Sequence, residues 1–170
     1  MSGAFNSDGI YKEQRAIYMF TEYLKKTFHN NNYVTFVPYD TDTKDIVDKK
    51  FHTDVLLMIS EDFFGLKHLE KSTYRIDMKS VTDEWNKGFD TNFSISDTIL
   101  NEKNPSLLPD IFGFYLKIED KTYLFFVRYY DVMKLVNRQN GYGLVNLRNL
   151  LDNNFVFLCI NSDLDVCIYG

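Results

Sequence analysis

Two short apolar segments, residues 52–59 and 74–81, constrain the fold more than any other part of the sequence. Each has the length and the content of aliphatic residues that are typical of a β-strand. The first carries Asp54 just before its apolar run, and the second carries Asp77 and Lys79 two positions apart. Because side chains alternate between the two faces of a strand, Asp77 and Lys79 are predicted to share one face.

A charged pair inside an otherwise apolar strand costs free energy of desolvation unless it has partners or a task. If the two predicted strands are neighbours, Asp54, Asp77 and Lys79 converge. Two carboxylates and one ammonium group are the components of a metal-dependent phosphodiesterase site. The alternative is structural, with Asp54 capping a strand while Asp77 and Lys79 pair with each other.

The predicted elements mix helices and strands, which indicates an α/β protein with a central mixed β-sheet flanked by helices. A helix is expected at 10–28, because Ile17, Phe20 and Leu24 form one apolar stripe, which Glu13 extends. Strands are expected at 33–39, 55–60, 74–81, 112–118, 122–127, 155–160 and 164–169, further helices at 94–100, 130–137 and 144–151, and a loop at 139–143. Neither a linker nor a repeat is evident, so residues 1–170 are expected to form a single domain.

The composition is that of a folded protein. The chain has 170 residues, of which 45% are hydrophobic, enough for a sizeable core. Its net charge of −5 argues against a non-specific nucleic-acid coat protein, which is usually basic. The N-terminus lacks the pattern of a signal peptide, and no segment approaches the roughly 20 apolar residues of a membrane span. A cytoplasmic location without membrane association is therefore expected.

Two cysteines, Cys159 and Cys167, each lie in an apolar strand-like segment. A free cysteine behaves as a small apolar side chain, and nothing in the sequence suggests a secreted disulfide framework. Both are therefore expected to be core thiols in a reducing compartment, with a hairpin disulfide as the alternative.

The order of a helix, a strand, a strand preceded by Asp54 and a strand containing Asp77-x-Lys79 resembles the PD-(D/E)xK nuclease superfamily. The resemblance covers residues 10–130 and implies the restriction-endonuclease-like fold. It also implies an endonuclease that hydrolyses DNA phosphodiester bonds with Mg²⁺ or Mn²⁺. Asp54 and Asp77 are then the metal ligands, and Lys79 orients the attacking water. Glu13 on the first helix is implied as a further catalytic carboxylate and metal ligand.

Basic residues close to these segments are candidates for DNA binding. Lys49 and Lys50 shortly precede Asp54, where they could contact phosphates. Arg75 shares the predicted face of Asp77, so it is expected either to contact a phosphate or to anchor an acidic neighbour.

Two further side chains lie near the predicted site. Trp85 follows the second strand, where its ring could stack on a base of the substrate or pack as a partly buried residue. His52 lies two residues before Asp54, where it could touch the site, although a position at the surface is expected.

Two classes of function are consistent with these features. The first is a DNA endonuclease, with a homodimer supplying the second active site if both strands are cut. The second is a catalytically silent nuclease-fold protein that acts as a binding or inhibitory module for a protein or nucleic-acid partner, in a phage or host-defence context. The acidic charge and the many Tyr and Phe residues would suit a protein interface. RNA cleavage by the same site is a third option.

Overall fold

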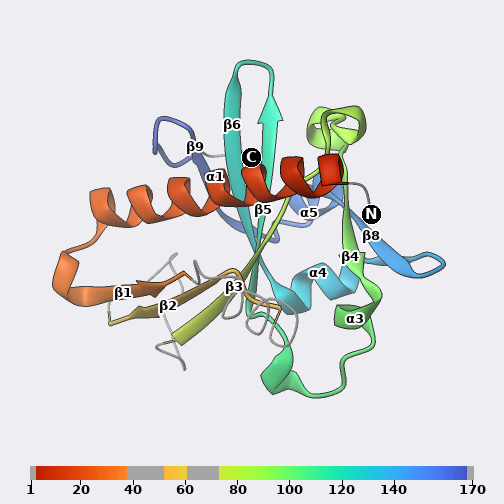
Figure 1. Ribbon diagram of the computed structural model, residues 1–170, viewed down its shortest axis with the longest axis horizontal. Coiled ribbons are helices and arrows are strands. Elements are labelled where there is room, and N and C mark those ends of the chain that lie inside the picture. Colours follow the sequence, from red (N-terminus) through yellow and green to blue (C-terminus); the bar gives the residue numbers. More distant parts are fainter. Residues whose placement is uncertain (1–2, 38–51, 61–72, 168–170) are drawn as a thin grey trace.

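A six-stranded mixed sheet forms the centre of the molecule (Figure 1). The computed structural model describes residues 3–37, 52–60 and 73–167. The strands of this sheet are β1 (Tyr33–Phe36), β2 (Val55–Ile59), β3 (Thr73–Lys79), β5 (Ile111–Ile118), β6 (Lys121–Arg128) and β9 (Val156–Asn161). Their spatial order is β1-β2-β3-β5-β6-β9, and all neighbours are antiparallel except the parallel pair β3 and β5. The predicted mixed sheet with flanking helices is therefore confirmed.

Helix α1 (Gly3–Thr27) lies across one face of this sheet (Figure 1). Its predicted apolar stripe is buried, with Phe20 and Leu24 fully inaccessible to solvent. The ring centroid of Phe20 lies 5.2 Å from that of Phe126 on β6. Burying one such side chain contributes about 1.5–3 kcal/mol, so packing on the sheet holds this helix in place. None of the helices in the described part of the chain is long and apolar enough to cross a membrane.

The opposite face of the central sheet carries a second, smaller sheet and short helices. Strands β4 (Asn92–Ser96), β8 (Tyr142–Asn146) and β7 (Asn137–Arg138) form this antiparallel sheet in the order β4-β8-β7. The accompanying helices are α3 (Asp97–Leu100), α4 (Tyr129–Leu135) and α5 (Leu147–Asp152), and the 3-10 turns are η1 (Asn30–Asn32), η2 (Asp83–Trp85), η3 (Gly88–Asp90) and η4 (Pro105–Leu107). Phe93 of β4 packs on Phe114 of β5, with ring centroids 4.7 Å apart.

The second sheet corrects three predictions. The helix expected at 94–100 begins at Asp97, the loop expected at 139–143 is partly strand, and the helix expected at 144–151 begins at Leu147. Residues 92–96 alternate strictly between exposed or half-buried and fully buried side chains. A period of two is typical of a half-buried strand. Only two of these five residues, Phe93 and Ile95, are apolar, so the pattern in the sequence was too short to indicate a strand.

The last predicted hairpin forms only in part. Its first strand is β9, but the return segment makes a single bridge, between Ile160 and Val166. Residues 168 and 169 lie outside the described part of the chain. The strand expected at 33–39 ends at Phe36, with residues 38 and 39 likewise outside that part.

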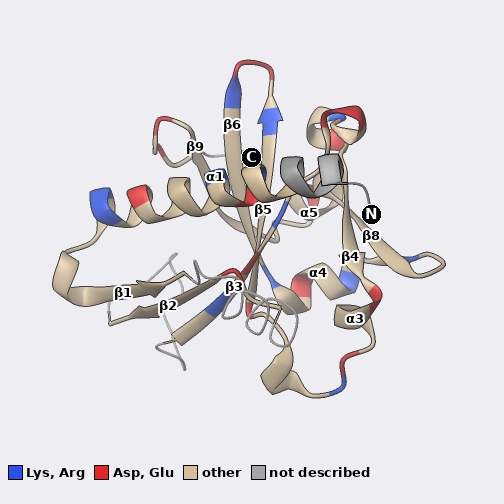
Figure 2. Ribbon diagram, in the orientation of Figure 1, with Lys and Arg blue, Asp and Glu red and all other residues tan. Residues whose placement is uncertain are grey.

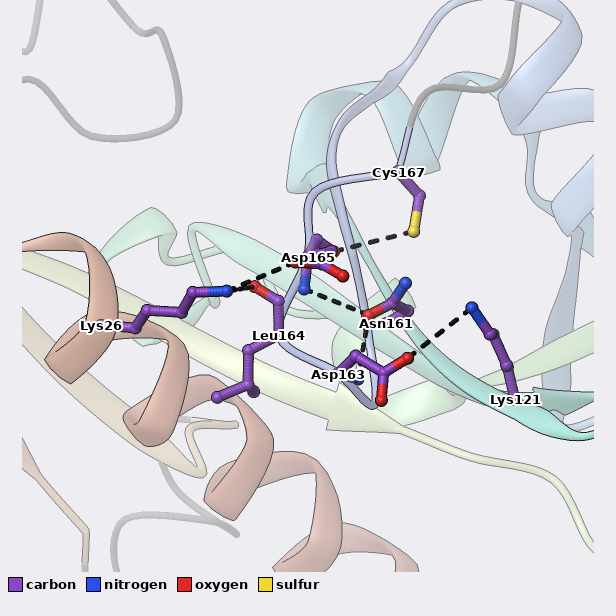
Figure 3. Close-up of polar contacts among 7 residues, drawn as sticks. All are labelled: Lys26, Lys121, Asn161, Asp163, Leu164, Asp165 and Cys167. Atoms are coloured by element: carbon purple, nitrogen blue, oxygen red, sulfur yellow. Dashed lines mark hydrogen bonds and ion pairs between the residues drawn. The ribbon is translucent and has the colours of Figure 1, made fainter.

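A tight turn after β9 connects three parts of the fold (Figure 3). The side-chain oxygen of Asn161 accepts hydrogen bonds from the backbone N–H groups of Asp163 (2.9 Å) and Asp165 (3.1 Å). Lys26 of α1 lies 3.3 Å from Asp165, and Lys121 of β6 lies 3.6 Å from Asp163. Exposed ion pairs contribute about 0–1 kcal/mol each, so the buried Asn161 is the main support of the turn.

The side chain of Met78 on β3 packs over Gly113 of β5, with which it pairs. A Cβ atom on Gly113 would lie 2.5 Å from the sulfur of Met78 and 3.3 Å from a ring carbon of Phe126. A side chain at position 113 therefore has no room unless Met78 moves.

We predict that Gly113→Ala destabilises the protein by about 1–3 kcal/mol, because overpacking forces neighbouring side chains from their preferred positions. The free energy of unfolding is measured by urea titration. Gly9→Ala is the matched control, since no atom lies within 4 Å of the added Cβ. Equal stability of the two variants would contradict the close packing at Gly113.

The two cysteines are both free thiols, but their surroundings differ. Cys159 is buried, which confirms it as a core thiol, whereas Cys167 is half-buried. The backbone N–H of Cys167 donates to the carbonyl oxygen of Cys159 at 2.8 Å. Burial, together with the nearby Cys167 thiol, raises the pKa of Cys159 well above its usual value.

We predict that iodoacetamide at pH 8 modifies Cys167 in the folded protein and leaves Cys159 unmodified. The thiolate is the form that reacts with iodoacetamide. At Cys159 the raised pKa keeps the thiol protonated, and burial keeps the reagent away from it. Mass spectrometry should show one adduct in buffer and two in urea. Cys167→Ser should then show none in buffer. Rapid addition of two adducts to the folded protein would be inconsistent with this difference.

Candidate functional site

Asp54 lies directly before β2, beside Asp77 on β3. The backbone N–H of Asp54 donates to the carbonyl oxygen of Ile76 at 2.9 Å, and its Oδ2 accepts from the backbone N–H of Met78 at 2.7 Å. These two bonds reach the residues on either side of Asp77, so the two aspartates lie next to each other on adjacent strands. Asp54 is 3% exposed and Asp77 is 4% exposed.

Asp77 and Lys79 form an ion pair on one face of β3. The Nζ atom of Lys79 lies 3.0 Å from Oδ2 of Asp77. The lysine side chain is 22% exposed, whereas that of the aspartate is 5% exposed, so the pair extends from the protein interior to solvent. Acidic and basic residues accordingly lie along β3 at the centre of the sheet (Figure 2). Ile76 and Met78 point to the opposite face and pack in the cluster beneath α1.

Both contacts of the structural alternative are thus present. Asp54 binds the backbone at the start of β2, and Asp77 pairs with Lys79. An ionised carboxylate has two oxygens with about four acceptor positions, so carboxylates in general can serve a structural role or bind a cation.

The donor set of this pair fits a hard divalent cation. Among the residues that the structure describes, no group of three or more His, Cys, Asp and Glu side chains could hold a metal ion. Mg²⁺, however, commonly binds one or two carboxylates and keeps several of its waters. Asp54 and Asp77 supply carboxylate oxygens alone, which suit Mg²⁺ or Mn²⁺ better than a soft metal.

Glu13 lies apart from the two aspartates. Helix α1 covers the face of the sheet to which Ile76 and Met78 point, whereas Asp77 projects from the other face. Glu13 is half-buried on this helix, in line with the apolar stripe, as the sequence pattern indicated. The sheet itself separates it from Asp77, so the structure does not add a third carboxylate from α1 to the pair.

His52 is buried, with 8% of its surface exposed, so the expected surface position is wrong. Its backbone φ angle is 50°, in the left-handed region that few residues other than glycine adopt. The chain turns inward at this residue, and Thr53 and Asp54 are buried directly after it. A backbone turn of this kind has no signature in the apolar periodicity, which explains why the sequence did not indicate it.

Arg75 anchors an acidic neighbour, which confirms the second of its two expected roles. Its backbone N–H donates to Oδ2 of Asp110 at 2.8 Å, and its Nε lies 3.7 Å from the same oxygen. The guanidinium also donates to the carbonyl oxygens of Ser106 and of Pro105 in η4, the latter at 3.4 Å. The side chain therefore ties the loop before β5 to β3.

The other predicted substrate contacts are Lys49, Lys50 and Trp85. Lys49 and Lys50 fall outside the residues that the structure describes. Trp85 lies on η2, where its side chain is 64% exposed and lines a cavity of about 370 Å³. This cavity begins at Ser80, directly after Lys79, so Trp85 is close to the charged strand.

Comparisons with known proteins give no assignment for this site. No protein-family model, no curated protein and no solved structure matches the chain. What the site can do is therefore inferred from its own side chains.

We predict that Arg75→Met lowers the free energy of unfolding by about 1–3 kcal/mol, because the carboxylate of Asp110 loses its ion-pair partner and two carbonyl groups lose a donor. Arg75→Lys should restore little of this loss, since lysine lacks the planar fork of the guanidinium. Arg128→Met is the matched control. Its ion pair, with Asp131, is longer, at 3.9 Å, and its side chain is more exposed. Urea titration checks the difference, and equal losses in the Arg75 and Arg128 variants would argue against the anchoring role.

Proposed function

We propose that this protein is a nuclease that hydrolyses DNA phosphodiester bonds with a divalent metal ion. The observation that carries the proposal is the placement of Asp54 beside Asp77, held by the 2.7 Å hydrogen bond to the N–H of Met78. Two carboxylates on adjacent strands are a suitable ligand set for Mg²⁺ or Mn²⁺. Lys79 adds a positive charge next to them, at the point where the pair reaches solvent.

Each of the three side chains has a distinct task in this proposal. A bound Mg²⁺ lowers the pKa of a coordinated water and neutralises charge on the phosphate. Asp54 and Asp77 hold the ion through their carboxylate oxygens. Lys79 orients the attacking water and stabilises the negative charge that develops on the phosphate oxygens. Without a metal ion, its ammonium group balances the buried charge of Asp77.

The arrangement of elements supports the same reading. Helix α1, strand β1, strand β2 after Asp54 and strand β3 with Asp77 and Lys79 follow each other in the order that resembles the PD-(D/E)xK superfamily. The antiparallel pairing of β2 with β3, the parallel pairing of β3 with β5 and the cover of α1 are consistent with a restriction-endonuclease-like fold. We include this fold in the proposal.

We predict that the purified protein nicks supercoiled plasmid in Mg²⁺ or Mn²⁺ and that EDTA abolishes the cleavage. Asp54→Asn, Asp77→Asn and Lys79→Met should each reduce the rate by about 100-fold or more, because each removes a charge that acts on the transition state. Agarose gels measure the loss of supercoiled DNA, and thermal melting shows that each variant is folded.

The matched controls are Asp163→Asn and Lys121→Met, which remove the same charges from an exposed ion pair after β9. Both should cleave at the rate of the unmodified protein. Cleavage that persists unchanged in the Asp77 and Lys79 variants would remove the assignment to this site. A parallel assay with single-stranded RNA tests whether the site cuts RNA instead.

A second candidate is a catalytically silent protein that binds a partner through the same face. Val34, Phe36 and Met58 are 56%, 44% and 45% exposed. They lie on the face of β1 and β2 that points away from α1, and Val34 pairs directly with Met58. An exposed apolar patch of this kind is typical of a protein interface. Absence of cleavage with every DNA and RNA substrate would favour this function.

A further inference from the structure

A cavity of about 370 Å³ opens beyond the charged end of β3. Among the described residues, four parts of the chain contribute to its wall: Gly9 of α1, the segment after β3, turn η2, and the paired strands β4 and β8. The side chains that line it include Ser80, Thr82, Trp85, Asn92, Ser94 and Tyr142. The cavity therefore lies where the central sheet, the small sheet and the beginning of α1 meet (Figure 1).

Two aromatic side chains line this cavity while remaining exposed to solvent. Trp85 is 64% exposed and Tyr142 is 41% exposed. On β4 and β8 the alternate residues Phe93 and Val145 point into the core, so Asn92 and Tyr142 project from the other face of the small sheet, toward the cavity. Exposed rings in a concave site are suited to stacking on a planar ligand.

The rest of the wall that the structure describes is partly apolar, from Val81 and Leu144, and partly polar. Ser80, Thr82, Asn92 and Ser94 offer hydroxyl and amide groups, and the described residues that line the cavity include no charged side chain. A flat, neutral group with hydrogen-bonding edges could stack on the aromatic rings and bind the hydroxyl and amide groups of this wall.

We propose that this cavity binds the nucleobase of an unpaired nucleotide in single-stranded DNA or RNA. The cavity volume falls within the roughly 300–1,000 Å³ that is usual for small-ligand sites. A base inside a duplex is paired and stacked, so it would have to leave the helix before it could enter. Stacking on aromatic rings tolerates all bases, because every base has a π-face.

The position of the cavity relates it to the proposed nuclease site, on which this inference rests. Ser80 directly follows Lys79 and lies three residues after Asp77. At about 3.3 Å per residue, this part of the wall lies about 10 Å from Asp77 along the chain. Because three is an odd number of positions, Ser80 and Asp77 point to opposite faces, so a nucleotide strand bound at both places would pass around the end of β3.

Trp85 makes the inference directly testable, because it is the single tryptophan of the chain. The intact protein in EDTA is titrated with a 15-nucleotide oligothymidine, with the corresponding dT–dA duplex and with thymidine monophosphate while tryptophan emission is recorded. We expect saturable quenching by the single strand, weaker binding of the monophosphate, and little response to the duplex. Quenching by the duplex as strong as that by the single strand would overturn the inference.

Substitutions assign the binding to the cavity. Tyr142→Ala should weaken single-strand binding about 5- to 100-fold, the effect of losing one stacking partner. Tyr130→Ala is the matched control, because Tyr130 is 72% exposed on α4 and does not line the cavity. Equal effects of the two substitutions, or no quenching by the unmodified protein, would overturn the inference.

The anisotropy of a labelled oligonucleotide measures binding without a tryptophan signal, so it can be recorded for the Trp85→Ala variant, whose binding is expected to weaken. Since Trp85 is largely exposed, this variant is expected to melt at the temperature of the unmodified protein. Base binding that fails while the plasmid is still cleaved removes the inference and leaves the proposed nuclease function. Base binding that succeeds while Mg²⁺ produces no cleavage removes the nuclease function and leaves the base site.

Discussion

The hydrogen bond between the carboxylate of Asp54 and the backbone N–H of Met78 is the contact on which the arrangement of the charged site depends. The chain turns at His52, and the side chain of Asp54 continues the pairing of β2 with β3. Without this acceptor a buried N–H group of the central sheet would lose its partner, at a cost of about 1–3 kcal/mol. The same bond brings a second carboxylate next to Asp77. Such a pair is tolerated because Lys79 supplies the opposite charge.

The central sheet separates two environments, and β3 contributes to both. One face of the strand is apolar and packs in the cluster under α1, while the other carries the charges of Asp77 and Lys79. The packing of Met78 over Gly113 and the contacts of Arg75 with Asp110 both hold β3 against β5. A charged group held by packed neighbours keeps its geometry, which is what a catalytic or binding site requires. The aromatic cavity begins where this strand ends.

Much of the central sheet could be predicted from local patterns. Strands β2, β3, β5, β6 and β9 and helix α1 follow apolar runs or stripes that are readable in the sequence. The small sheet was missed, because β4 and β8 each bury one face only. Their existence depends on pairing between residues about fifty positions apart, for example Phe93 with Val145. Sequence periodicity reports whether a segment can be half-buried, and it carries no information about its partner.

The sequence by itself determined that Asp77 and Lys79 share a face within a buried strand and that one stripe of the first helix faces the core. Both follow from the fixed periods of strand and helix, which are local properties of the backbone. Only the tertiary structure decided which distant groups meet. It joined Asp54 to the strand of Asp77, directed Arg75 to Asp110, and set Glu13 on the other side of the sheet. It also brought Trp85 and Tyr142 to one cavity. These contacts depend on which strands pair and on which face of the sheet each side chain lies, and both are determined only when the whole core packs.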